Sequence, residues 1–154
     1  MPLLRLRGLL SGAWLGIVIC VAAFAAPAAF AVLERADAGR FVGRLFAMEA
    51  AASLALAMLL ILIERRLTRD EPRVITAEFL LAAGALFCTV AGYYAVQPQM
   101  EAARAGQGTL SFGALHAISA GALTLKGVLL LVLAWRSSAA HASKQPTAPE
   151  RSTS

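Results

Sequence analysis

Charged residues are scarce in this chain of 154 residues, at 15%, whereas hydrophobic residues make up 59%. This composition is more apolar than that of an ordinary soluble domain. The charges present are gathered in short clusters between long apolar runs, so the net charge of +5 does not indicate a nucleic-acid partner. We therefore expect an integral membrane protein whose partner is the lipid bilayer and whose arginines and lysines set its topology.

Cysteine and histidine are also rare, with two of each. Cys20 and Cys88 lie inside apolar runs without a CxxC or zinc-type spacing, so we interpret them as packing residues. His116 lies in an apolar run and His141 in a polar tail, which excludes a site built from several histidines of one chain. The motifs of serine hydrolases, phosphate-binding loops and zinc proteases are missing from the sequence, so we expect a non-enzymatic role.

Four apolar runs are long enough to cross a bilayer, which takes about 20 helical residues. They cover residues 9–33, 45–63, 76–96 and 112–135. In hydrocarbon only helices and closed barrels satisfy their own backbone, and four segments are too few for a barrel. The sequence thus predicts an all-α bundle of four transmembrane helices over residues 9–136, after an N-terminus of residues 1–8. Residues 137–154 have the polar composition of a disordered tail, and no internal repeat is visible.

The basic residues are distributed unequally between the two sides of the membrane. Nine lysines and arginines lie in the N-terminus, the second connection and the tail, against four in the other two connections. The positive-inside rule then predicts that both termini are cytoplasmic, in a bacterial inner membrane.

Ionisable residues interrupt two of the apolar runs. His116, Ser119 and Lys126 share one face of the fourth predicted helix. Glu49 and Ser53, four residues apart, share a face of the second helix. Because polar groups at membrane depth are costly, we expect both faces to point into the bundle.

Depth suggests a pairing between these two faces. Glu49 and His116 each lie four residues inside their apolar run, counted from the same side of the membrane, so we predict an ion pair that closes or gates the bundle. Two alternatives remain: each side chain separately reaches water, or His116 ligates a metal or haem. Lys126 lies near the bilayer middle, where it either pairs or extends its long stem toward the interface.

Small residues and one proline shape the predicted helices. Pairs of glycines at a spacing of four predict close helix packing: Gly12 with Gly16, and Gly39 with Gly43. Pro27, late in the first helix, predicts a kink because its ring prevents regular helical hydrogen bonding. Such a kink would either open space beside the predicted ion pair or only relieve packing.

Two segments, WLGIVICVAAFAAPAAFAVLERADAGRFVGRLFAMEA and FGALHAISA, resemble a family of small bacterial integral membrane proteins, the domain of unknown function 4149 family, which is related to the transmembrane protein 205 group of eukaryotes. The resemblance extends from Trp14 to Trp135. Its most specific residues are Ala26, Pro27, Phe30, Ala38, Gly39, Phe46, Glu49, Phe112, His116 and Ser119. The resemblance implies a four-helix membrane domain, and it implies no particular activity.

These observations leave three functional hypotheses. The first is a non-enzymatic structural or small-molecule-handling protein with a Glu49/His116 pair inside the bundle. The second is an oxidoreductase-like haem- or metal-binding protein in which His116 is the ligand and Glu49 orients it. The third is a proton-linked transporter that uses Glu49, His116 and Lys126 as a relay. A single four-helix chain is small for alternating access, so the third hypothesis predicts a homo-oligomer, most simply a homodimer.

Overall fold

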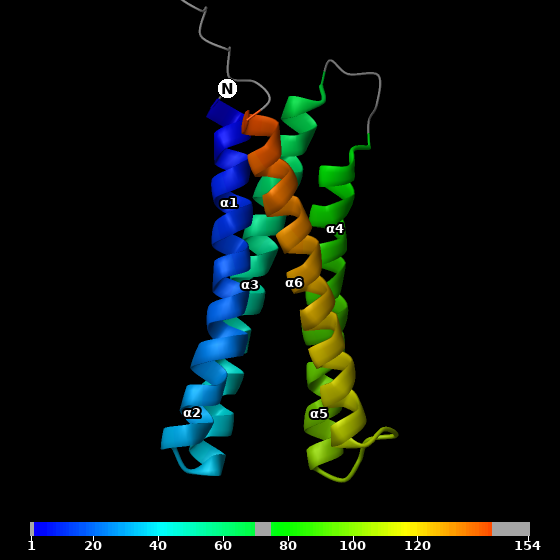
Figure 1. The fold of residues 1–154 in the computed structure, drawn as a ribbon. Coiled ribbons are helices and arrows are strands. Elements are labelled where there is room, and N and C mark those ends of the chain that lie inside the picture. Colours follow the sequence, from blue (N-terminus) through cyan, green and yellow to red (C-terminus); the bar gives the residue numbers. More distant parts are fainter. Residues whose placement is uncertain (1, 70–74, 143–154) are drawn as a thin grey trace, which may run out of the picture.

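A computed structural model describes residues 2–69 and 75–142, and every element among these residues is helical. Four helical segments are long and apolar enough to cross a membrane: Pro2–Val32, Arg35–Leu67, Ala77–Arg104 and Phe112–Ala139. The segments lie side by side in an elongated bundle (Figure 1). The predicted all-α, four-helix membrane bundle is confirmed.

The first two segments form a helical hairpin, here named the first hairpin. α1 (Pro2–Ile19) continues through a π-helical segment, η1 (Cys20–Ala25), into α2 (Ala26–Val32). The chain is extended at Leu33 and then returns along the whole bundle as α3 (Arg35–Leu67).

The second hairpin repeats this order of elements. α4 (Ala77–Thr89) continues through a second π-helical segment, η2 (Val90–Ala95), into the short α5 (Gln97–Arg104). After a connection, the chain returns as α6 (Phe112–Ala142). The fold therefore contains a structural repeat although the sequence shows none.

A proline follows each π-helical segment and explains its position. Pro27 lies in the first turn of α2, and Pro98 lies in the first turn of α5. A proline has no N–H group, and its ring displaces the carbonyl of the preceding turn. The wider hydrogen bonding of a π-helix gives such carbonyls new partners, which hydrocarbon requires. The irregularity expected at Pro27 is thus a π-helical segment, and the side chain of Pro27 is exposed rather than buried beside a polar pair.

The four long helices occupy the corners of a square. α1 packs against α3 and α6, and α4 packs against the same two helices, so α1 faces α4 and α3 faces α6 across the diagonals. Exchanging the hairpins reproduces this set of contacts. The two hairpins are therefore equivalent in their helix contacts.

The two ends of the bundle differ. We name the end that holds the start of α1 and the end of α6 the terminal end, and the opposite end the splayed end. The apolar core between the hairpins draws on all four long helices: Trp14, Val18, Ala57, Leu60, Ala82, Ala85, Leu130 and Leu133. At the splayed end, η1, α2, η2 and α5 pack within their own hairpins, and the hairpins diverge there (Figure 1).

The helices are longer than the apolar runs of the sequence. α1 starts at Pro2 rather than residue 9, and α3 starts ten residues before Leu45. α6 continues to Ala142, so the chain stays helical past the expected tail boundary at residue 137. Hydropathy marks only the hydrocarbon-spanning part, whereas helical hydrogen bonding continues into the polar interface. Residues 143–154 of the predicted tail lie outside the described residues.

Candidate functional site

A buried ion pair lies at the centre of the bundle. The Lys126 Nζ atom is 2.8 Å from Oε1 and 3.0 Å from Oε2 of Glu49, and each side chain is only 3% exposed. Glu49 follows the first residue of α3 by fourteen positions, and Lys126 follows the first residue of α6 by the same number. The two residues occupy equivalent places in the two hairpins. Their ion pair joins the hairpins across a diagonal of the square.

Two further side chains complete this site. Ser53, one turn after Glu49 on α3, donates a hydrogen bond from Oγ to Glu49 Oε1 at 2.6 Å. Trp14 on α1 donates from Nε1 to Ser53 Oγ at 2.7 Å, and Lys126 Nζ lies 3.4 Å from the same hydroxyl oxygen. We name these four residues the central cluster.

The contacts of the central cluster offset the free-energy cost of placing charged groups in the middle of a membrane. Glu49 contacts Lys126, which lies about 14 Å along the helix axis from Trp135, the end of the apolar run in α6, at 1.5 Å per residue. An isolated carboxylate or ammonium ion there loses its hydration, a cost that direct pairing and additional hydrogen bonds offset. Glu49 receives both kinds of stabilisation, from Lys126 and Ser53.

The structure pairs Glu49 with Lys126 and not with His116. His116 lies only four residues into α6, so it is about 15 Å along the axis from Lys126. Its side chain is exposed, and its ring stacks on Phe112 with a centroid separation of 6.1 Å. The predicted pairing fails because it assumed that Leu45 and Phe112 lie at the same height in the bundle. The packing of the helices instead brings Glu49 to Lys126, ten residues beyond His116 on α6.

Ser119, the other polar residue on the predicted polar face of the fourth helix, contributes to helix packing. Its Oγ donates to the backbone oxygen of Gly92 at 2.8 Å, within the second hairpin. The two predicted polar faces, on α3 and α6, do contact each other, but through Ser53, Glu49 and Lys126.

A metal centre at His116 has little support in this geometry. Within residues 2–69 and 75–142, no three His, Cys, Asp or Glu side chains group in a way that would hold a metal ion. Within this part of the chain, His116 thus belongs to no group of three or more such side chains, and it lies on an exposed helix face.

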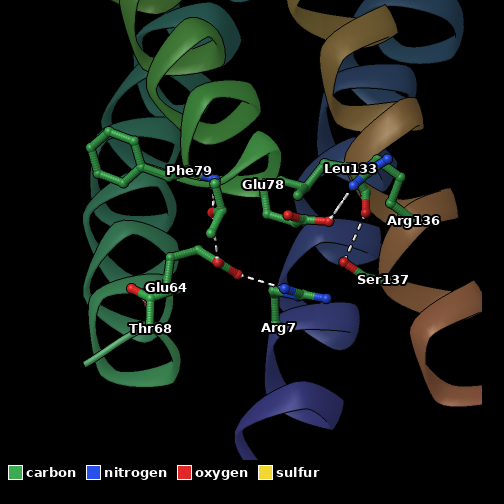
Figure 2. Close-up of polar contacts among 9 residues, drawn as sticks. Arg7, Glu64, Thr68, Glu78, Phe79, Leu133, Arg136 and Ser137 are labelled. Carbon is green, nitrogen blue, oxygen red and sulfur yellow. Dashed lines mark hydrogen bonds and ion pairs between the residues drawn. The ribbon is translucent and has the colours of Figure 1, made fainter. Parts of the chain in front are cut away.

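A second group of charged residues, the terminal cluster, lies at the terminal end (Figure 2). Arg7 Nη1 of α1 is 2.7 Å from Glu64 Oε1 of α3, and Thr76, the N-cap of α4, donates to Glu64 Oε2 at 3.2 Å. Arg136 of α6 binds Glu78 Oε1 of α4, with Nε at 3.0 Å and Nη2 at 2.9 Å. Side-chain contacts thus link α1 to α3, α3 to α4, and α4 to α6.

The predicted glycine pairs do not bring helices together within this chain. A Cβ atom added at any of them meets nothing within 4 Å: Gly12, Gly16, Gly39 and Gly43. Two helical segments do approach closely at a glycine of the second hairpin, where a Cβ atom added to Gly92 of η2 would lie 2.5 Å from Ala122 Cβ of α6. In an alanine-rich chain, two glycines four residues apart do not distinguish a lipid-facing surface from a helix contact.

Sequence reasoning missed Trp14, Arg7 and Glu64 as partners of the buried charges. A signal for the first two exists in the periodicity of α1. Its buried residues are Arg7, Ser11, Trp14 and Val18, at the i, i+4, i+7 and i+11 spacing of one helix face. Arg7 on that face indicates a buried partner rather than a topological charge alone.

The fold and its central cluster define the class: a multi-pass membrane protein built as a four-helix bundle with ionisable residues in its interior. The family described as Domain of unknown function (DUF4149) matches residues 9–109. The chain belongs to this family, as the sequence resemblance suggested. The matched range contains Trp14, Glu49 and Ser53 and ends before α6, which carries Lys126. No curated protein and no solved structure matches the chain.

Proposed function

We propose that this protein is a proton-linked membrane carrier of a small solute, and that the Glu49–Lys126 pair is its working site. The buried ion pair between equivalent positions of the two hairpins is the observation that carries this proposal. A well-packed apolar contact usually stabilises a protein interior as well as a buried ion pair does. Ionisable residues at membrane depth therefore favour a functional role over a purely structural one.

The proposed mechanism uses the two hairpins as rigid halves. A proton on Glu49 cancels the attraction to Lys126 and so removes the ion pair that joins the halves at mid-membrane. Transporters built from repeats commonly rock one repeat against the other around a central site. The splayed end is then the entry side, and the terminal cluster with the apolar core closes the opposite side.

Two earlier expectations change under this proposal. His116 is too far along α6 to pass a proton directly to Lys126, so the relay reduces to the Glu49–Lys126 pair. One chain already contains two hairpins that can move against each other, so a homodimer is not needed for alternating access.

The proposed orientation, with both termini in the bacterial cytoplasm, has its own test. A reporter enzyme that is active only in the periplasm is fused after Ala142, the last residue of α6. We expect no reporter activity, and strong activity would reverse the orientation. A fusion in the connection after Arg104, on the opposite side, serves as the positive control.

The mechanism is tested by spectroscopy on the protein in lipid nanodiscs. Infrared difference spectra recorded against pH should show a protonated carboxyl band that Glu49→Gln removes and Glu64→Gln retains. Spin labels at Val32 and Glu101, both exposed, report the distance between hairpins at the splayed end in a cysteine-free background. We expect Glu49→Gln to shift that distance distribution. An absent Glu49 band together with an unchanged distribution would refute the proposal.

A further inference from the structure

We infer that the solute is a small organic anion with a carboxylate group, bound by Lys126 while Glu49 carries the coupled proton. This inference rests on the proposed function and adds to it a chemical class of substrate. It follows from the hydrogen-bond donors of the central cluster and from the charge balance at that depth.

The donors of the central cluster converge on a carboxylate. The Trp14 indole and the Lys126 ammonium group can only donate hydrogen bonds. Ser53 accepts a hydrogen bond from Trp14 and donates one from its hydroxyl to Glu49 Oε1. Lys126 contacts both carboxylate oxygens of Glu49. Glu49 is the acceptor that this set surrounds. When Glu49 is protonated and released, another carboxylate is the group that best satisfies the same donors.

Charge balance favours an anion over a cation. With Glu49 protonated, the ammonium group of Lys126, a residue only 2% exposed, is left without its counter-charge in the middle of the bundle. An organic anion restores neutrality, whereas an organic cation would place a second positive charge beside the first. One proton on Glu49 and one carboxylate on Lys126 give the site the same net charge as the empty ion pair. No covalent bond changes in this exchange.

The packing around the cluster limits the size of the probe. Ala50 follows Glu49 and Ala57 lies one turn after Ser53 on α3, and both are fully buried, which shows that the helices pack closely here. A small anion displaces the fewest packed side chains. Butyrate is therefore a suitable probe, and butylamine is its counterpart of opposite charge.

The experiment uses tryptophan fluorescence. The chain has two tryptophans, so Trp135→Phe leaves Trp14, which belongs to the central cluster, as the only emitter. Trp135 is 74% exposed, which makes its replacement structurally mild. The full-length variant in nanodiscs is titrated with butyrate or butylamine over a pH range in which butyrate stays ionised, and empty nanodiscs correct for partition into lipid.

We expect butyrate to change Trp14 emission saturably, with tighter binding as pH falls, and butylamine to change nothing. Adding Glu49→Gln should make butyrate binding independent of pH, because the internal carboxylate is gone. Adding Lys126→Met to that variant should weaken butyrate binding roughly tenfold or more, since a charged hydrogen bond is lost. The two variants differ only in Lys126, and neither contains an unpaired Glu49 carboxylate.

The outcomes separate this inference from the proposed function. Saturation by butylamine alone, or by neither probe, overturns the substrate class. The proposed function survives either result if the infrared band of Glu49 still titrates. Equal butyrate affinity with and without Lys126 also overturns the inference. If the Glu49 band and the hairpin distance are both insensitive to pH, the proposed function itself fails.

Discussion

The two hairpins share one backbone plan and differ in what their side chains do. Each has a long helix, a π-helical segment, a short helix with a proline and a long return helix. At the equivalent central position, the first hairpin has the acid Glu49 and the second has the base Lys126. The similar backbones thus place opposite charges at facing positions of the two hairpins, where they pair.

The hairpins also differ in how their own helices are held together. In the first, the Arg7–Glu64 pair is almost fully buried, with side chains 7% and 4% exposed. In the second, the Arg136 side chain is 47% exposed, and close backbone packing at Gly92 holds η2 against α6. The first hairpin therefore has a buried ion pair, whereas the second has a partly exposed ion pair and a close helix contact.

The largest effect should come from breaking the pair that joins the hairpins. Lys126→Met leaves the Glu49 carboxylate buried without a counter-charge, and removal of one partner of a buried ion pair costs about 3–5 kcal/mol. Denaturant unfolding in bicelles, followed by circular dichroism, measures the loss. The variant Glu49→Gln/Lys126→Met should recover most of it, because no uncompensated charge remains. Equal stability of the single and double variants would show that the pair is not formed.

A smaller effect should distinguish the ion pairs within the hairpins. Arg7→Met removes the buried partner of Glu64, and we expect a loss of about 2 kcal/mol, because Glu64 lies near the polar interface and can regain water. Arg136→Met should cost less than about 1 kcal/mol, since its exposed guanidinium is screened by solvent. The same unfolding assay compares the two variants. A larger loss for Arg136→Met would contradict the proposed difference between the hairpins.

The fold was largely predictable from the sequence because hydrocarbon imposes a simple rule. An apolar run of about 20 residues in lipid has to form a helix, so four runs gave four helices. The helix ends were less predictable, since a helix that has left the hydrocarbon can continue with polar residues. The extension of α3 back to Arg35 is such a case. The depth inferred for Glu49 was wrong for a separate reason, because Leu45 and Phe112 do not lie at the same height in the bundle, as the Glu49–Lys126 contact shows.

The central cluster was predictable only in part. Glu49, Ser53 and Lys126 were identified as interior polar residues because their spacing places them on helix faces. Their partners depend on which helices are diagonal in the bundle, and helix periodicity does not contain that information. Arg7 was counted among the topological charges for the same reason, because only the packing of α1 against α3 shows that Glu64 meets it.

The packing difference between the hairpins is tested by two matched glycine substitutions. Gly92→Ala places a methyl group 2.5 Å from Ala122 Cβ, so the helices have to separate, at a cost of about 1–3 kcal/mol. Gly16→Ala on α1 meets nothing within 4 Å and should be neutral or stabilise the helix by up to about 1 kcal/mol. Thermal unfolding in the same bicelles measures both. A destabilising Gly16→Ala would indicate that this face of α1 contacts a second copy of the chain.

The smallest effect is expected at His116, a candidate cofactor ligand that lies exposed on α6. His116→Ala removes a ring that stacks on Phe112 at an exposed helix face, so stability should change by less than about 0.5 kcal/mol. The decisive readout is an absorption spectrum with metal analysis of the purified protein beside this variant, and we expect the two preparations to be identical. A Soret band or a stoichiometric metal that disappears with His116 would make the second hairpin a cofactor-binding element. The chemical role would then lie at His116 of the second hairpin, and no longer at the Glu49–Lys126 pair alone.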